Sequence, residues 1–317
     1  MNYIGRRLAV TILTLFLVSI ISFGAFRLIP GDAAVLALGT EATNEQIEAL
    51  RSEMGLDKSL SGQYFSWLKN FLTGNLGNSS RFRGASISGM ILDRLPVTFA
   101  LAGLSFIFII LIAVPVSILS VRKENSIADR IVATIAALNI SVPGFFLGIL
   151  FIWIFGLILK FFVPGAYVGY EENPAAFFGY LVFPALAIAL PNAALVIKFL
   201  RSSIFREFQS DYVRTARSKG ASHSRLLRSH VLKNASLPVI TLLGMIAGEI
   251  LSGSIVIEQV FGIPGIGRLL IASISARDYP MIQTLIIYIA FAVILANTIA
   301  DIALQMIDPR IRLTEKV

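Results

Sequence analysis

Among the polar residues inside the long apolar runs of this sequence, five are candidates for a function, because a polar side chain there is costly unless it has a task. They are Glu249, Asn192, Gln283, Asn297 and Asp301. Glu249 stands near the middle of its run, and an acid at that depth in a membrane is by default a functional candidate. We predict that the first four line a pathway for a polar solute, with Asp301 weaker because it lies near the end of its run. The alternative for Glu249 is a protonated or hydrogen-bonded carboxyl group that only stabilises the fold.

Most other site chemistries lack their residues. The chain has no cysteine, and both of its histidines, His223 and His230, lie in one basic segment. A metal site needs clustered His, Cys or carboxylate ligands, and a Ser–His–Asp triad needs a histidine beside the serine. Nucleotide-binding loops are absent too, because no GxxxxGK[ST] occurs and residues 262–268 read GxxGxG rather than GxGxxG. We therefore expect no metal site and no catalytic residue, and the chain is not expected to be an enzyme.

The basic segment, Asp211–Pro238, contains no acid between Arg214 and Lys233 and is flanked by apolar runs. A polar segment between membrane spans must project into water. The sequence favours helices broken at Gly220, and the small residues Ala216, Gly220 and Ala221 would let another surface approach closely. The alternative is an ordinary basic loop on the cytoplasmic side of a membrane.

The apolar runs that carry these residues indicate a membrane protein. The composition is 56% hydrophobic and only 15% charged, with a mean hydropathy of +0.79. Because the basic residues lie beside the apolar runs, the net charge of +8 reflects membrane orientation rather than nucleic-acid binding. Each run is long enough to cross a bilayer as a helix. We predict an all-α membrane protein with six spans, at residues 8–29, 95–121, 131–159, 180–200, 237–260 and 281–307.

Lysine and arginine near the span ends predict the orientation. With six spans, Arg6, Arg122, Arg201 and Arg310 fall on the same side as the basic segment. By the positive-inside rule, that side and both termini are cytoplasmic. The first apolar run is longer than the core of a signal peptide and lacks a small-residue cleavage site, so we expect a retained span.

The first external connection, residues 30–94, is long enough to hold its own helices. The pattern from Thr43 to Gln46 is a capping box, which predicts a helix that Gly55 ends. A second helix is expected at Gln63–Leu72, with one apolar face made by Tyr64, Trp67, Leu68 and Phe71. That face would lie at the membrane surface or pack against the rest of the connection, and the sequence does not separate the two.

Prolines and glycines predict irregular, closely packed spans. Pro115, Pro143, Pro184 and Pro191 lie within the second, third and fourth spans and should bend them. The fifth span has Gly244, Gly248 and Ser252 at a spacing of four, which permits close helix approach. The third span has a similar row of Gly144, Gly148 and Gly156. Packing is the simpler function of these rows, and a gate would use the same surfaces.

Several motifs, in order along nearly the whole chain, resemble one family. Residues 214–220 (RTARSKG), followed by Leu237-Pro238, resemble the EAA loop of ABC importer permeases, in the variant of the dipeptide/oligopeptide/nickel group. The B-type subunit of that group is also matched at 30–32, 55–57, 74–79, 95–98, 261–268, 277–280 and 308–312. There are departures: Arg214 stands for the general motif's Glu, and Ala33 and Ser59 replace common prolines.

The resemblance implies a type I ABC importer permease fold with a long external segment between the first two spans. It implies that the basic segment is a coupling helix that docks on an ATPase. The motif maps onto Arg214, Thr215, Ala216 and Gly220, and nearness adds Arg217, Lys219, Ser222 and His223. It also implies a homologous second permease that pairs with this chain as a heterodimer, two cytoplasmic ATPases and an external binding protein. No cofactor is expected in this chain, since ATP and Mg would be bound by the partner ATPases.

The expected organisation follows from the spans and the resemblance. Residues 1–29 form the cytoplasmic N-terminus and first span, 30–94 the external segment, 95–307 the core with a coupling loop at 207–236, and 308–317 a cytoplasmic tail. The expected location is a bacterial or archaeal inner membrane. The expected function is ATP-driven uptake of di- or oligopeptides. Nickel, a metal chelate, glutathione or an opine are alternative substrates, and a secondary transporter without an ATPase is the alternative of a different class.

Overall fold

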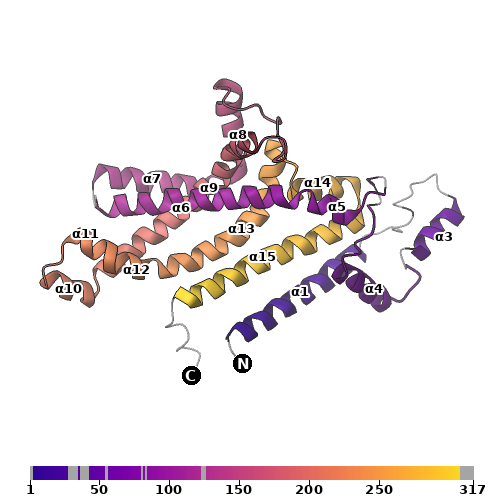
Figure 1. The fold of residues 1–317 in the computed structure, drawn as a ribbon, viewed down its shortest axis with the longest axis horizontal. Helices are drawn as coiled ribbons and strands as arrows, with labels where there is room; N and C mark the ends of the chain where they lie inside the picture. The colour runs from indigo at the N-terminus through magenta and orange to yellow at the C-terminus, as the bar shows by residue number, and fades with distance from the viewer. Residues whose placement is uncertain are drawn as a thin grey trace. The chain divides into compact units, whose positions relative to one another are not determined.

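The computed structural model describes residues 3–27, 35, 43–53, 56–79, 81–82, 84–122 and 126–307. In these ranges the chain is built from helices, and the β pairing consists of one isolated bridge between Asn78 and Ser86 (Figure 1). The predicted all-α class is confirmed. The motifs expected at 30–32 and 308–312, the substituted Ala33, the helix end at Gly55 and the tail 308–317 lie outside the described residues.

Five helices of the described chain are long and apolar enough to cross a membrane. They belong to α1 (Tyr3–Arg27), α6 (Leu95–Arg122), α9 (Pro174–Phe208), α13 (Leu237–Phe261) and α15 (Tyr279–Ile307). Each coincides with a predicted span, although α9 begins before residue 180 and continues beyond residue 200. A sixth span results if one bent pair of helices is counted as a single crossing.

The predicted third span is that bent pair. Helix α7 (Ile127–Ser141) is followed by α8 (Gly144–Phe151) and a π-helical turn, η1 (Ile152–Ile158), with a bend of 102°. The bend falls at Val142 and Pro143, where the backbone turns extended. Pro143 therefore ends a helix, because proline disfavours helical geometry in the residue before it. By contrast, α6 runs through Pro115, and α9 through Pro184 and Pro191.

The chain forms two compact units. The first contains Met1–Thr98 and Pro264–Ile294, and the second contains Phe99–Ile263 and Leu295–Val317. These units are defined by contacts within the chain and not by the sides of a membrane. The predicted domain boundaries at residues 29/30, 94/95 and 307/308 therefore stay predictions.

The first unit contains several shorter helices and a small apolar core. Its further helices are α3 (Asn44–Glu53), α4 (Leu60–Leu72), α5 (Ile87–Leu92) and α14 (Ile266–Ala276). The core consists of Ile87, Ile91, Ile266, Leu269, Met281 and Leu285. The predicted capping box starts α3: the Thr43 backbone N–H donates to Gln46 Oε1 at 3.0 Å, and the Gln46 N–H donates to Thr43 Oγ1 at 3.3 Å.

Hydrogen bonds in the first unit join sequence motifs that lie far apart in the chain. The Ser79 hydroxyl donates to the buried carboxylate of Asp278, and that carboxylate also accepts from the Met281 N–H at the start of α15. The Ile266 N–H at the start of α14 donates to Thr98 Oγ1 at 2.9 Å. These contacts give a structural reason for the residues matched at 74–79, 95–98 and 277–280: they cap helices and tie them together.

The second unit is organised around α9. This helix carries the largest run of buried side chains in the described chain and packs against α7, α8 and α13. The Tyr180 hydroxyl on α9 donates to the Phe261 carbonyl at 2.6 Å, at the end of α13. Gly144 brings α8 close to α9, since a Cβ there would lie 3.1 Å from the Ala187 carbonyl oxygen. Gly148 faces Phe261 of α13 in the same way.

Candidate functional site

The basic segment is a folded unit that leaves α9 and leads into α13. It consists of α10 (Asp211–Ser218), α11 (His223–Leu226), a π-helical turn, η2 (Leu227–Val231), and α12 (Leu232–Ala235). Five apolar side chains are almost fully buried and hold these turns together and against α9: Val213, Leu226, Leu227, Val231 and Ala235. This apolar base distinguishes the segment from a loosely attached basic loop.

Polar and aromatic contacts fix the segment to the end of α9. The Tyr212 hydroxyl donates to Glu207 Oε2 at 2.6 Å and accepts from Asn234 Nδ2 at 3.1 Å. The His223 ring stacks on Phe208 with centroids 4.8 Å apart. Burial raises the pKa of Tyr212 above its usual value of 10, and the hydrogen bond to Glu207 raises that pKa further. The segment is therefore fixed to α9 through Tyr212 and His223, and its first and last helices are joined through Tyr212 and Asn234.

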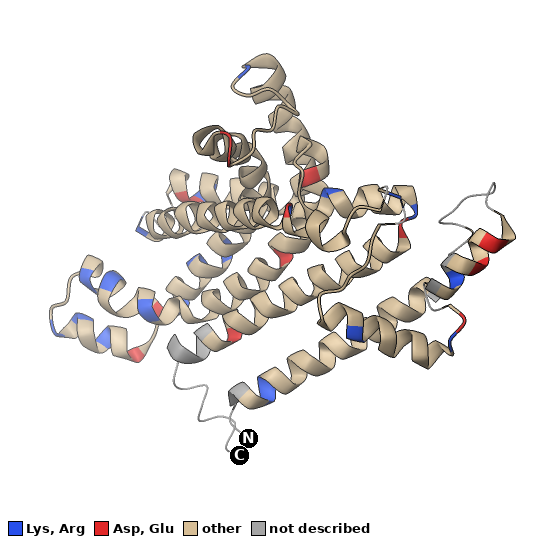
Figure 2. Ribbon diagram, turned by 45° about the vertical axis from the view of Figure 1, so that its right-hand side comes forward, with Lys and Arg blue, Asp and Glu red and all other residues tan. Residues whose placement is uncertain are grey.

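The residues predicted to contact an ATPase lie on the outside of this unit. Exposed side chains are those of Arg214, Thr215, Arg217, Lys219, Ser222 and His223, with Gly220 also exposed and Ala216 half-buried. In Figure 2, blue Lys and Arg residues gather on these turns, while the long spans are mostly tan. The predicted break at Gly220 is present, with a φ of 83° that favours glycine. A Cβ on Gly220 would meet nothing within 4 Å, so the space outside it is open.

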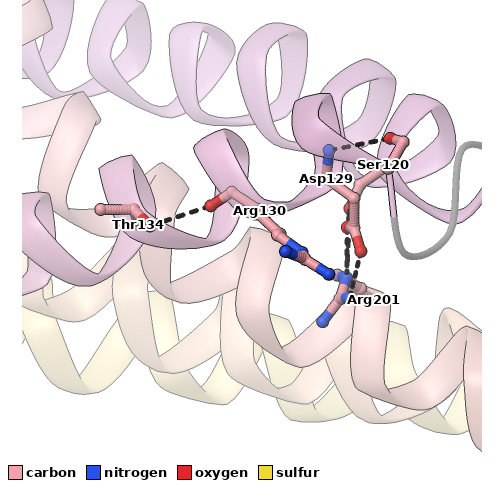
Figure 3. Close-up of polar contacts among 6 residues, drawn as sticks. Ser120, Asp129, Arg130, Thr134 and Arg201 are labelled. Carbon is pink, nitrogen blue, oxygen red and sulfur yellow. Dashed lines mark hydrogen bonds and ion pairs between the residues drawn. The ribbon is translucent and has the colours of Figure 1, made fainter.

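An ion pair near the end of α9 that leads into the basic segment joins α9 to α7, and a hydrogen bond adds α6. No prediction from the sequence included this contact. Arg201 of α9 donates to both Asp129 carboxylate oxygens, from Nε at 3.0 Å and from Nη2 at 2.8 Å. The Ser120 hydroxyl of α6 also donates to Asp129, which begins α7 (Figure 3). Arg201 stacks over the Phe205 ring at 4.9 Å. The pattern from Ser126 to Asp129 marks a helix start, but no sequence signal pairs Asp129 with a residue in another helix.

Glu249 is the central residue of the 25-residue helix α13, and it is exposed. The same face exposes Thr241, Met245, Ser252, Gly253 and Val256, which together with Glu249 we call the polar face of α13. The exposed side chains of α1 are different, since Ile12, Leu13, Leu17 and Ile21 are all large and apolar. A lipid-facing surface has the composition of α1. The polar face of α13 also exposes the apolar Met245 and Val256, and it differs from the exposed surface of α1 through Thr241, Glu249 and Ser252.

The glycine row of α13, which borders the polar face, packs against α15. A Cβ on Gly248 would lie 2.9 Å from Asn297 Oδ1, and a Cβ on Gly244 would collide with the Ala300 Cβ. These two glycines permit the close approach predicted for them, whereas Ser252 of the same row is exposed and donates to the Glu249 carbonyl at 3.1 Å. Asn297, a predicted pathway residue, lies in this packing contact.

Among the described residues, no hydrogen bond joins the Glu249 side chain to the remaining pathway candidates. Asn192 is half-buried and donates to the Ile188 carbonyl of its own helix at 2.9 Å. Gln283 is half-buried in the first unit, whereas Glu249 belongs to the second. Asp301 is half-buried near the end of α15. Their role in a pathway stays a prediction.

Comparison with known proteins gives the family. Residues 113–313 match the model of the "binding-protein-dependent transport system inner membrane component", and residues 1–102 match the model of its N-terminal part. A protein of Sinorhizobium fredii named "Probable peptide ABC transporter permease protein" is 35% identical over 98% of this chain and 99% of its own. A Brucella abortus protein, named as a peptide transport system permease, is 36% identical over 97% and 98%. The "Glutathione transport system permease protein" of Escherichia coli is 36% identical over 98% and 99%.

The two family models together cover most of the chain, and the relatives align over nearly its full length. Such permeases are multi-pass inner membrane proteins that work with an ATPase and a substrate-binding protein. The expected resemblance is therefore confirmed. This chain belongs to the family of binding-protein-dependent transport system inner membrane components, the permease subunits of ABC importers.

Proposed function

We propose that the chain forms part of the translocation pathway for di- and oligopeptides, delivered by an external binding protein, and that the polar face of α13 lines this pathway. The observation that carries the proposal is the exposure of Glu249 at the centre of a membrane span. A charged side chain at the centre of a lipid-facing helix costs about 2.5–3.5 kcal/mol on insertion scales, and a water-filled pathway removes that cost. The peptide substrate is supported by the names of the Sinorhizobium and Brucella relatives.

Energy for transport comes, in this proposal, from two cytoplasmic ATPases that bind ATP and Mg, while the chain itself catalyses nothing and carries no cofactor. The exposed outside of the basic segment docks on one ATPase, and a homologous second permease pairs with this chain as a heterodimer. Both termini and the basic segment lie in the cytoplasm, as the distribution of Lys and Arg suggests. Nucleotide and the loaded binding protein then bias a two-state equilibrium between inward- and outward-facing forms.

The pathway is tested by replacing Glu249 with Gln and measuring uptake of cationic, neutral and anionic peptides into proteoliposomes that contain the complete transporter. We expect a several-fold change in the preference between cationic and anionic peptides, because the variant loses a charge that the solute passes. The matched control is Glu48→Gln, which removes the same charge from the exposed external helix α3. Unchanged uptake of all three peptides by the Glu249 variant would exclude a pathway position.

The docking of the basic segment is tested by Gly220→Trp. The control is Gly165→Trp, since Gly165 also has a positive φ, of 82°, and open space around it. Backbone strain is then similar in both variants. We expect Gly220→Trp to insert into the membrane but to lose transport and copurified ATPase, and Gly165→Trp to keep the ATPase. Normal uptake by the Gly220 variant would argue against a tight docking surface.

Glutathione is a second candidate substrate, because the Escherichia coli relative named for glutathione transport is as similar to this chain as the Brucella relative. Competition separates the two: excess glutathione should leave uptake of a labelled dipeptide unchanged if peptides are the substrate. Complete suppression at micromolar glutathione would favour the second candidate.

A further inference from the structure

The external helix α4 has two apolar stripes, and only one of them is covered by the chain. The inner stripe, Tyr64, Trp67 and Phe71, packs against α1 and the start of α15. Its ring contacts are Phe23 with Tyr64 at 5.4 Å, Phe23 with Trp67 at 5.9 Å and Phe71 with Tyr288 at 5.6 Å. The outer stripe consists of Phe65, Leu68 and Leu72, which follow one another at helical spacing.

The inner stripe touches α1 well inside its apolar span. Tyr64 shares a hydrogen bond of 2.7 Å with the Ser19 hydroxyl, and its ring lies 6.3 Å from that of Phe16. The apolar span of α1 covers Gly5–Phe26. At 1.5 Å per residue, Ser19 lies roughly 10 Å inside the end of that span and Phe16 lies near its middle. A helix that packs on these residues lies at the depth of the hydrocarbon core rather than above it.

Two of the three side chains of the outer stripe are strongly exposed at this depth, and Leu68 is half-buried. Phe65 is 63% exposed and Leu72 is 76% exposed. The flank of α4 on the other side of Phe65 is polar, with the exposed residues Ser66, Lys69 and Asn70. Beside it, α1 exposes Leu17, Ile20 and Ile21, which are as apolar as the outer stripe. The two helices therefore offer apolar surface at the same level of the membrane. The exposed Lys69 borders the outer stripe of α4, and its long side chain can carry its charge away from the apolar surface.

We propose that the outer stripe of α4 binds lipid acyl chains, so that α4 is embedded in the leaflet that the C-terminal half of α1 crosses. The two positions that the sequence left open for the aromatic helix then both apply: one stripe packs on the chain, and the other faces lipid. The external segment is anchored in the membrane next to the first span as a result. This inference does not depend on the substrate or on the role of Glu249.

Site-directed spin labelling tests the proposal, because the chain has no cysteine of its own. Single variants Phe65→Cys and Leu72→Cys carry a nitroxide on the outer stripe, and Ser66→Cys and Asn70→Cys are matched controls on the polar side of the same helix. Each is measured in nanodiscs, in the full assembly that copurifies with the chain. The unsubstituted assembly gives the background from cysteines in other subunits. Collision with oxygen, which concentrates in lipid, is compared with collision with a water-soluble nickel chelate.

We expect oxygen collisions to exceed nickel collisions several-fold at positions 65 and 72, and the ratio to reverse at positions 66 and 70. Nickel collisions at positions 65 and 72 as frequent as at the controls would place the stripe in water and overturn the proposal. Low collision with both reagents at positions 65 and 72 would show that a second copy or another subunit covers the stripe, which also overturns it. Oxygen dominance at all four positions would contradict the two-sided helix.

Discussion

Single residues in this chain differ in how far the sequence alone reveals them. Glu249 stands out because one acid interrupts an apolar run, and the structure adds that it is exposed on the polar face of α13. Gly220 is predicted as a break, and its positive φ explains the glycine. Asp129 could not be predicted, because its partners Arg201 and Ser120 come from other helices. A local pattern reports local structure, and a contact between helices needs the fold.

The glycines of α13 give a prediction at this scale. Gly244→Ala and Gly248→Ala should each destabilise the isolated chain by about 1–3 kcal/mol, because the new methyl group meets Ala300 or Asn297 across the contact with α15. Gly253→Ala is the control on the same helix, since a Cβ there meets nothing within 4 Å. It should be neutral or stabilising by up to about 1 kcal/mol. Thermal unfolding in nanodiscs measures the difference, and equal midpoints for all three variants would contradict the close packing.

Tyr212 predicts a dependence on alkaline pH. Its pKa is raised in the fold by burial and by the bond to Glu207, so the folded state favours the protonated phenol. The stabilisation is complete below pH 10 and is lost as the pH rises through the folded-state pKa. Tyr212→Phe lacks this titration. Between about pH 9 and about pH 11, the thermal midpoint of the unsubstituted chain should therefore fall further than that of the Tyr212→Phe variant. Equal falls for the two proteins would contradict the assigned contact.

At the scale of elements, the prolines show where sequence patterns are ambiguous. All four were expected to bend their spans. Pro143 separates two helices at a bend of 102°, whereas α6 and α9 each continue as one helix through Pro115, Pro184 and Pro191, where a bend stays a prediction. A proline bends or ends a helix according to whether neighbours satisfy the freed carbonyl, and these neighbours are not visible in the sequence. The ends of helices were more predictable. The capping box that begins α3 and the break at Gly220 after α10 both depend on adjacent residues.

The ion pair between α7 and α9 gives the prediction at this scale. Asp129→Asn leaves the Arg201 guanidinium without its carboxylate and should cost about 1–3 kcal/mol, less than for a fully buried pair because Arg201 is 31% exposed. Arg130→Ala, at the exposed neighbouring position, should change stability little. The double variant Asp129→Asn with Arg201→Gln should lose less than the sum of the single losses. Strict additivity in this double-mutant cycle would show that the pair contributes no coupling.

For the whole molecule, the sequence was sufficient for the class and the family, since span length and ordered motifs can both be read along the chain. The five long spans and the bent pair coincide with the six predicted segments. What the sequence could not show is how distant motifs meet, such as Ser79 with Asp278 and Thr98 with Ile266. Nor could it show that the predicted pathway residue Asn297 packs against Gly248. These contacts join residues far apart in the chain, and a pattern of adjacent residues does not encode them.

The central claim is that this chain is the permease subunit of an ATP-driven importer. The most direct measurement is purification of the chain from its native membrane in mild detergent, with mass spectrometry to identify and count the copurified subunits. The account predicts one homologous second permease and two ATPase subunits for each copy of this chain. A chain that transports substrate and purifies without any ATPase would contradict it.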